Sequence, residues 1–267
     1  MINLPLKIDY SGKVVVITGA GGLICGAMAR AFAQCGAKVA ALDINLDAVT
    51  KLADELTAEG FICKGYKANV LDPAALEAVH VQVLADLGKC DVLVNGAGGN
   101  NPRATTSNEY HHEATPEGKS FFDLDADGVD FVFKLNFQGT LLPTQAFAKD
   151  MLETGGCILN ISSMNAYTPL TKIPAYSAAK AGMIGLTTDS AAYLGPYGIR
   201  VNAISPGGFE RTQPEHFIRD YSNLTMLKRM GRGGFDLKGA VAFLASDAAA
   251  YITGHNLVID GGFTKYK

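Results

Sequence analysis

The feature that most constrains the fold is a regular alternation of apolar, valine- and isoleucine-rich runs with longer helical stretches. The apolar runs occupy residues 13–19, 37–44, 61–70 and 90–98. Helical patterns separate them at 23–36, at 45–60 and after Asp72, where Pro73 takes a first-turn position. Strands buried on both faces have near-continuous apolar runs, and strands that alternate with helices form parallel sheets. The sequence therefore predicts an α/β fold, a Rossmann-like doubly wound parallel sheet with helices on both faces.

The second half of the chain continues this pattern within a single domain that spans residues 1–267. A long helical stretch at 127–152 is expected to bend near Pro143, because proline removes a helical hydrogen bond. Further strands are predicted at 156–162, 199–208 and 256–262, with helices at 175–195 and 237–250. Two irregular stretches, about 99–124 and 207–235, follow strand ends. Open α/β sheets bind ligands at that edge, so both stretches are predicted substrate loops.

Charge and cysteine content exclude several classes of protein. The 23 lysines and arginines face 26 aspartates and glutamates, which gives a formal charge of −3. This balance argues against nucleic acid or an anionic membrane as the main partner. No run approaches the roughly 20 apolar residues of a membrane-spanning helix, and the N-terminus has no long apolar signal region. The five cysteines are scattered, odd in number and without a CxxC pair, so we expect reduced thiols in a cytoplasmic protein.

A glycine-rich loop joins the first predicted strand to the first helix. The segment TGAGGLICG (18–26) places Gly19 and Gly21 as in a GxGxxG loop, with Ile24 in place of the third glycine. Glycines let the backbone approach a pyrophosphate, and the free N–H groups of a helix N-terminus attract it. The alternative is a tight structural turn. The strand–loop–helix context favours a dinucleotide site that includes Gly19, Gly21, Gly22, Leu23 and Ile24.

Asp43 ends the second predicted strand, 24 residues after Gly19. A carboxylate at this point accepts hydrogen bonds from the ribose hydroxyls of an adenosine and repels a 2′-phosphate. No arginine follows in the run LDINLDAV, so the sequence favours NAD(H) over NADP(H) as the cofactor. The alternative is a surface or helix-capping aspartate.

Tyr176 and Lys180 stand four residues apart on a predicted alanine-rich helix, so they share one face of it. A tyrosine has a pKa of about 10, too high for a base at neutral pH, and a nearby ammonium lowers it. We therefore expect Lys180 to make Tyr176 a working acid/base. Ser163 follows a predicted strand end, where it can hold a substrate oxygen. The alternative for the pair is a tyrosine packed under a lysine stem.

Six elements in order resemble the short-chain dehydrogenase/reductase family over essentially the whole chain. The family has a TGxxxGxG loop, an Asn-Ala-Gly-type turn, a helical asparagine, a serine, a YxxxK pair and a Pro-Gly turn. Here the corresponding elements are TGAGGLICG, NGAG (95–98), Asn136 in KLNFQG, Ser163, YSAAK (176–180) and PGG (206–208). Leu23 and Cys25 depart from the pattern, because they stand where the family has glycines.

The resemblance implies a catalytic set and a wall for the cofactor. Tyr176 is implied as the acid/base and Lys180 as its tuner and ribose ligand. Ser163 is implied to position the carbonyl, and Asn136 to hold a water of the proton relay. Cofactor contacts are implied for the glycine loop, for Tyr176 and Lys180, and for Asp43, Ile44, Asn69, Val70, Asn95, Ala97, Gly98, Pro206 and Gly207.

Within the family, several stretches are most similar to the mannonate (fructuronate) oxidoreductases of sugar-acid breakdown. They are VNGAGGNNPRATT (94–106), GTLLPTQAFAKDM (139–151), ILNISSMNAYTPLTKIPAYSAAKAG (158–182) and the terminal GGFTKY. The implied reaction converts D-mannonate and NAD reversibly to D-fructuronate and NADH. The alternatives are another sugar-acid or polyol dehydrogenase, such as a gluconate 5-dehydrogenase-like enzyme, or a 3-oxoacyl reductase. A nucleotide-sensing regulator without chemistry is disfavoured, because all four catalytic positions are filled.

A sugar-acid substrate requires a cation for its carboxylate. Arg103 and Arg211 are the candidates, because arginine binds carboxylates bidentately, and the alternative for each is a solvated loop charge. Asn165 is a candidate contact for a sugar hydroxyl. The adjacent His111 and His112 could suggest a metal, but one such pair without a Cys, Asp or Glu geometry is poor evidence, so we expect surface histidines and no metal.

The helices expected at 126–154 and 174–196 are alanine-rich and apolar. Members of the family commonly pair such helices between subunits, so the resemblance implies a homotetramer with 222 symmetry. The same apolar faces can instead pack against the sheet.

Overall fold

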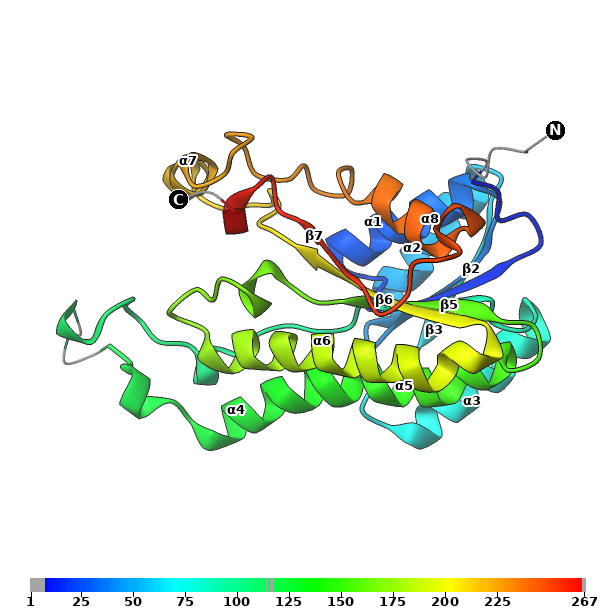
Figure 1. Cartoon of the computed structure of the whole chain (residues 1–267), viewed down its shortest axis with the longest axis horizontal. Helices are drawn as coiled ribbons and strands as arrows, with labels where there is room; N and C mark the ends of the chain where they lie inside the picture. Colours follow the sequence, from blue (N-terminus) through cyan, green and yellow to red (C-terminus); the bar gives the residue numbers. More distant parts are fainter. Residues whose placement is uncertain (1–7, 114, 116–117, 266–267) are drawn as a thin grey trace.

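The computed structural model describes residues 8–113, 115 and 118–265, and its centre is a seven-stranded sheet (Figure 1). The strands lie in the order β3-β2-β1-β4-β5-β6-β7, and every neighbouring pair is parallel. In chain order they are β1 (Val14–Thr18), β2 (Lys38–Asp43), β3 (Ile62–Lys67), β4 (Val92–Asn95), β5 (Gly156–Ile161), β6 (Ile199–Pro206) and β7 (Asn256–Ile259). The order reverses between β1 and β4, which is the point where a doubly wound sheet opens a crevice. The predicted fold class is confirmed.

Helices cover both faces of the sheet (Figure 1). On one face lie α1 (Leu23–Gln34), α2 (Leu46–Ala58) and α8 (Lys238–Ala245). On the other lie α3 (Pro73–Asp86), α4 (Ala126–Phe133), α5 (Gly139–Phe147) and α6 (Pro174–Leu194). Each face has its own apolar core, with Phe32 and Met28 fully buried in the first and Phe147 and Leu76 in the second. Burial of such side chains on two faces is the main source of stability in a fold of this kind.

Local sequence signals set the helix ends. The side chain of Asn45 accepts a hydrogen bond from Ala48 N at the start of α2. Asp72 caps α3, because its side chain accepts from the amides of Ala74 and Ala75, and Pro73 is the first residue of the helix. Gly36 follows α1 with a φ of +90°, a conformation that glycine adopts without a Cβ penalty.

The expected bend of the long helical stretch near Pro143 is wrong in position. The break comes earlier, where a π-helical turn (Lys134–Gln138) separates α4 from α5. Pro143 lies inside α5, and a 3₁₀ turn (Ala148–Met151) follows that helix. A π turn adds one residue to the helical ladder and is frequent at functional sites. Asn136 lies within this turn, so the distortion affects a predicted catalytic residue.

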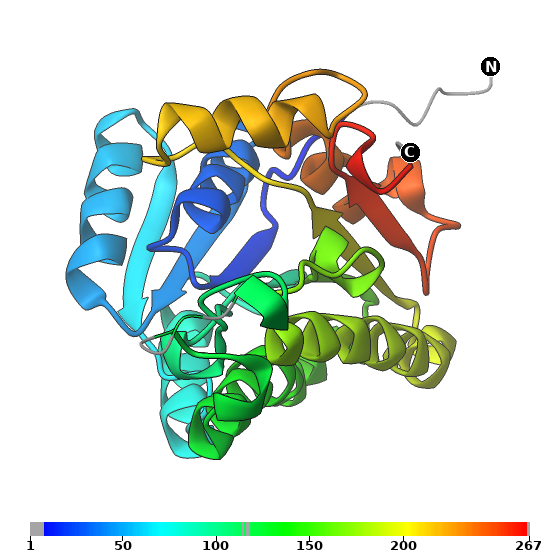
Figure 2. The same ribbon diagram turned by 90° about the vertical axis from the view of Figure 1, so that its left-hand side faces the viewer.

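Both predicted substrate loops lie at the carboxyl end of the sheet (Figures 1 and 2). The loop 207–235, expected to be irregular, contains the short helix α7 (Glu215–Asn223). Its sequence, EHFIRDYSN, has few apolar residues, but Phe217, Ile218 and Tyr221 fall on one helical face, a signal that the sequence analysis missed. Within the described residues, no helix is long and apolar enough to cross a bilayer.

Candidate active site

A pocket of about 670 Å³ opens at the carboxyl edge of the sheet, beside the β1–β4 switch point. Most of the predicted site residues line this one pocket. They are Gly19, Gly22, Leu23, Ile24, Asp43, Ile44, Asn69, Val70, Ala97, Gly98, Ser163, Tyr176, Lys180, Pro206, Gly207 and Arg211. Lining residues that range from Gly19 to Arg211 in the sequence thus meet at a single crevice of the size and position expected for a ligand site.

The sequence analysis missed several residues that line the same pocket. They are Cys25, Ala68, Gly96, Gly99, Asn100, Leu135, Ile161, Ser162 and Ile173. Many of them directly neighbour predicted site residues, so strand-end position was the available signal. Ile173 is an exception, because an apolar side chain beside a cleft has no mark in the sequence.

The glycine loop presents an open helix end to the pocket. Gly22 is the N-cap of α1 and supplies no side-chain hydrogen bond to the first turn. The first-turn amides and the positive end of the helix dipole therefore remain for an anion such as a pyrophosphate. The loop is tied to the next strand by Thr18, whose hydroxyl accepts from Gly96 N at 3.0 Å and Ala97 N at 3.2 Å. This tie fixes the two walls of the crevice relative to each other.

Asp43 lines the pocket and is hydrogen-bonded to the glycine loop. Its carboxylate accepts from Gly21 N at 3.0 Å and from Asn45 N at 2.9 Å. Gly21 itself does not line the main pocket; it lies in an adjacent one and reaches the site through Asp43. Asp43 is partly exposed, and its carboxylate keeps acceptor capacity beyond these two bonds.

Ser163 and Tyr176 both line the pocket. Ser163 follows β5, and its hydroxyl accepts from Asn165 N at 3.2 Å. Burial raises the pKa of Tyr176, while the polar influence of Ser163 and the charge of Arg211 oppose that rise. The phenol is therefore held in its protonated form, as a proton donor requires.

Lys180 does not act on the phenol as expected. Its Nζ lies 5.6 Å from the centre of the Tyr176 ring and donates to Ile161 O at 2.7 Å. The i,i+4 spacing thus places the ammonium by the ring face and not at the hydroxyl. Lys180 is only 3% exposed, and this burial lowers its pKa from 10.5 to about 8. In the protein without ligand, desolvation therefore destabilises the charged form of Lys180, and the pKa of Tyr176 stays raised.

Asn136 is fully buried and uses its whole side chain to hold the turn after β4. Its Oδ1 accepts from Gly99 N at 3.1 Å. Its Nδ2 donates to Gly99 O at 2.7 Å and to Val132 O at 2.8 Å. The side chain is outside the pocket lining, so any contact with a relay water falls to its backbone carbonyl, which already accepts from Thr140 Oγ1. Asn136 therefore shapes the wall at Gly98 and Gly99.

Two further predicted contacts lie behind the pocket wall. Asn95 is buried between strands and donates to Thr144 Oγ1 and to Asn160 Oδ1, both at 2.9 Å. Its expected contact with the cofactor is wrong, because the side chain points into the protein and braces β4 against β5. Asn165 is also buried and absent from the lining, so the expected contact with a sugar hydroxyl is wrong for this conformation.

The two candidate carboxylate ligands differ sharply. Arg103 donates to Asp125 at 2.7 Å and to Asp127 at 3.2 Å, and it is outside the pocket. Its charge is already neutralised, so the prediction that it binds substrate is wrong. Arg211 lines the pocket, and its charge reaches Tyr176. Among the described residues, Arg211 forms no ion pair with an acidic side chain.

Among the residues that the structure describes, neither the histidines nor the cysteines form a metal or disulfide site. His111 and His112 lie in an exposed turn, where they contact Phe122 and Tyr110 respectively. In the part of the chain that the structure describes, no three potential ligands come together for a metal ion. All five cysteines are free thiols. Burial raises the pKa of Cys25 to about 12, so this pocket thiol stays protonated.

Comparison with known proteins identifies the family. A sequence model described as enoyl-(acyl carrier protein) reductase matches residues 19–264. An uncharacterized oxidoreductase of Haemophilus influenzae is 45% identical over 99% of this chain and 98% of its own length. The chain belongs to the short-chain dehydrogenase/reductase family. The prediction from six ordered motifs is confirmed, and the enzyme class is that of an oxidoreductase.

Other members of the family differ in the substrates that their names state. A D-threitol dehydrogenase of Mycolicibacterium smegmatis is 37% identical over 98% of this chain and 96% of its own. A solved structure from Haemophilus influenzae, provisionally named a D-mannonate oxidoreductase and containing bound NAD, superimposes with a TM-score of 0.93. It is 43% identical, and the match covers 99% of both chains.

Proposed function

We propose that this NAD-dependent short-chain dehydrogenase/reductase interconverts an alcohol and a ketone of a sugar acid, most specifically D-mannonate and D-fructuronate. The observation that carries the proposal is the arrangement around Tyr176. Its phenol shares the pocket with Ser163 and lies within the field of Arg211, a pocket cation without an acidic partner among the described residues. A proton donor, a ligand for the substrate oxygen and a ligand for the carboxylate in one cleft would support this reaction.

The residues of the pocket fit NAD. The uncapped end of α1 suits the pyrophosphate, and Asp43 suits an unphosphorylated adenosine ribose. The related Haemophilus influenzae structure contains NAD, which supports the same choice here. Bound NADH supplies the hydride, and the protein supplies the proton and the orientation.

In the proposed reduction, Ser163 donates a hydrogen bond to the ketone oxygen of the substrate. Tyr176 transfers its phenolic proton to that oxygen as the carbonyl carbon gains the hydride, so the ketone becomes an alcohol. The raised pKa of Tyr176 keeps the proton available at neutral pH. The ammonium of Lys180 lies beside the Tyr176 ring and stabilises the phenolate charge that forms when the proton is transferred.

Tyr176→Phe tests the catalytic assignment. We expect the variant to lose turnover by about 10²–10⁴-fold, because general acid–base catalysis is removed, while NADH binding is retained. Absorbance of NADH follows turnover on a panel of hexuronates and aldonates, and fluorescence follows binding. Undiminished turnover by the variant would refute the assignment.

Arg211→Gln and Arg103→Gln form a matched pair that tests the sugar-acid assignment. Because only Arg211 faces the pocket, its loss should raise KM for fructuronate by about 10–100-fold, the value of a charge-assisted hydrogen bond. Arg103→Gln should leave KM unchanged. Neutral substrates such as D-threitol should be insensitive to both variants.

A polyol such as threitol is the second candidate substrate, because the match to the related D-threitol dehydrogenase covers nearly the whole chain. Preferential oxidation of D-threitol would support the polyol over the sugar acid.

We also propose that the enzyme acts in the cytoplasm as a homotetramer. On the helical layer formed by α4 and α6, Phe131, Phe133 and Tyr193 are 43%, 41% and 76% exposed. Exposed aromatic side chains on neighbouring helices are typical of subunit contacts. Light scattering should give four times the monomer mass, and a monomeric mass would contradict the proposal.

A further inference from the structure

The segment that follows β6, residues 207–211, carries the pocket residues Gly207 and Arg211 but lies beyond the end of the sheet. Gly207 N still donates to the carbonyl of Ile259, the last residue of β7, at 2.9 Å. Past this bond, Gln213 holds the segment locally, because its side chain accepts from Arg211 N at 2.6 Å and donates to Phe209 O at 3.0 Å. Two elements further along the chain also hold the segment. One is α7 and the other is the turn at 229–236.

Tyr221 of α7 holds the segment from one side. Its hydroxyl accepts from Gly208 N at 2.6 Å and donates to the sulfur of Met164 at 3.2 Å. A Cβ atom at position 208 would lie 2.6 Å from Cζ of Tyr221, so the ring contacts bare backbone that only glycine provides. The ring is buried and stacks on Phe263 at 4.9 Å. Because Met164 follows Ser163, one side chain joins α7, the 207–211 segment and the turn of the catalytic serine.

Gly231 holds the segment from the other side through its backbone. Gly231 N donates to Gly208 O at 2.9 Å, and Glu210 N donates to Gly231 O at 2.8 Å. The two segments thus form a short parallel bridge at Phe209 and Gly231. A Cβ at 231 would lie 2.6 Å from the ring of Phe209, so this approach also requires glycine.

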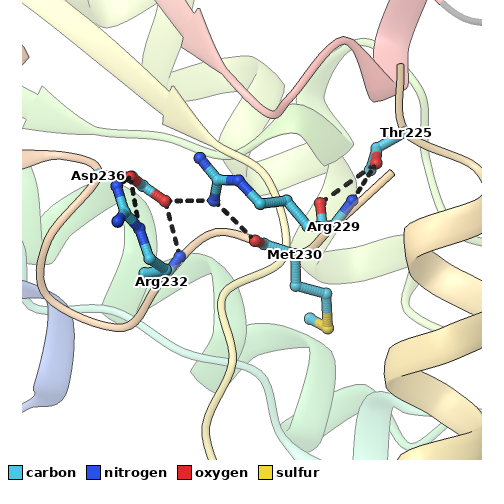
Figure 3. A network of polar contacts seen from close by, with 5 residues as sticks. All are labelled: Thr225, Arg229, Met230, Arg232 and Asp236. Atoms are coloured by element: carbon cyan, nitrogen blue, oxygen red, sulfur yellow. Dashed lines mark hydrogen bonds and ion pairs between the residues drawn. The ribbon is translucent and has the colours of Figure 1, made fainter. Parts of the chain in front are cut away.

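Asp236 fixes the turn that presents Gly231 (Figure 3). Its carboxylate accepts from Arg229 Nη1 at 2.5 Å and from the amide, Nε and Nη2 of Arg232 at 2.8, 3.1 and 2.6 Å. Arg229 is held in turn, because its side chain donates to Met230 O at 3.0 Å and its amide donates to Thr225 Oγ1 at 3.1 Å. The side chain of Asp236 is only 16% exposed, and these donors hold its pKa well below the usual range. One carboxylate therefore bonds to residues on both sides of Gly231.

We propose that Tyr221 and Asp236 are positioning residues that clamp segment 207–211, and with it Arg211, at the substrate end of the pocket. Neither residue lines the pocket, so both act through the segment. The identity of the substrate rests on the proposed function. Loss of the clamp displaces Arg211 and raises KM for the sugar acid, while NADH affinity and the proton transfer at Tyr176 change little.

The test compares Tyr221→Phe and Asp236→Asn with matched controls in the full-length enzyme. Tyr221→Phe keeps the ring, and its control is Tyr251→Phe at a fully exposed tyrosine. The control for Asp236→Asn is Asp220→Asn, at an exposed carboxylate on α7 that pairs with its neighbour Arg219. Each clamp variant should raise KM for fructuronate by about fivefold or more, as expected for the loss of one hydrogen bond, with kcat within about twofold of the parent enzyme.

Amide hydrogen exchange of the peptide that contains residues 207–211 provides a readout that needs no substrate. Both clamp variants should accelerate exchange in this peptide by about fivefold, and neither control should. The double variant should raise KM by less than the product of the single effects, because both residues act on one segment. Unchanged exchange in the clamp variants, or a lowered Tm with KM at the control value, would overturn the inference. If the parent enzyme turns over no sugar acid, the proposed function fails and the exchange result still decides whether the clamp exists.

Discussion

Lys180 provides the most quantitative prediction, because its ammonium is buried without a carboxylate. Burial lowers its pKa from 10.5 to about 8 in the protein without cofactor. The difference corresponds to about 3 kcal/mol by which the charged form is disfavoured in the folded state. This cost is present in full below pH 8, where the lysine is protonated both folded and unfolded. It is lost as pH rises from about 8 to 10.5, because the unfolded chain then binds more protons than the folded one.

The prediction compares the parent protein with Lys180→Met without cofactor. Between about pH 7 and pH 9.5, the free energy of unfolding of the parent should rise by about 2 kcal/mol relative to the variant. The lost hydrogen bond to Ile161 O adds an offset that does not depend on pH, so only the change with pH is diagnostic. Buried thiols and phenols that do not interact with Lys180 titrate in both proteins and cancel in the difference. Cys25, whose pKa the charge of Lys180 lowers, stays protonated in the folded state over this range because burial raises its pKa to about 12.

Urea unfolding at matched protein concentration measures both curves, since subunit association also contributes to stability. Parallel curves across this pH range would refute the desolvation argument. Addition of NAD should reduce the difference in slope, because a ligand that restores polar partners to the ammonium raises its pKa again. Lys180→Arg serves as a control, since a guanidinium stays charged throughout and removes the titration without removing the charge.

Three further predictions concern the walls of the pocket and its frame. Asp43→Asn removes the charge that repels a 2′-phosphate, so the preference for NADH over NADPH should fall by about tenfold or more in kcat/KM; an unchanged ratio would contradict the role of this carboxylate. Gly96→Ala places a methyl group against Cys25 Sγ and Thr18 O, so the free energy of unfolding should fall by about 1–3 kcal/mol. Adding Cys25→Ala in a double variant should restore part of this stability. Asp72→Ala removes the cap of α3 and should cost about 1 kcal/mol in urea unfolding without any change in KM.

The fold was predictable because its signals are local. Apolar runs, capping residues such as Asn45 and Asp72, and glycines after helices each act within a few residues, and the structure places them as expected. The relation of Tyr176 to Lys180 was predictable in position, since helical spacing sets it. Its electrostatics were not, because burial of the ammonium depends on packing from distant strands.

The errors in the predicted site share one physical cause, which is competition between partners that are distant in the sequence. Arg103 has the chemistry to bind a substrate carboxylate, but in the fold it pairs with Asp125 and Asp127. Asn95 suited a cofactor contact, but Asn160, which is 65 residues away, took its amide. The chemistry of a side chain determines what it can bind, and the fold determines which of these partners lies within bonding distance.

The strand order has a consequence for synthesis of the chain. β1 lies between β2 and β4, so one of its edges finds no partner until residue 95 has been made. A ribosome adds the roughly 77 residues from Thr18 to Asn95 in about 4–15 s. Once Lys67 completes β3, the half-sheet of β1 to β3 presents a bare apolar edge of β1 until β4 is made, and such an edge can pair with other nascent chains. Overexpression should therefore favour inclusion bodies when translation is fast, and slower translation or an abundance of chaperones should improve recovery of the enzyme.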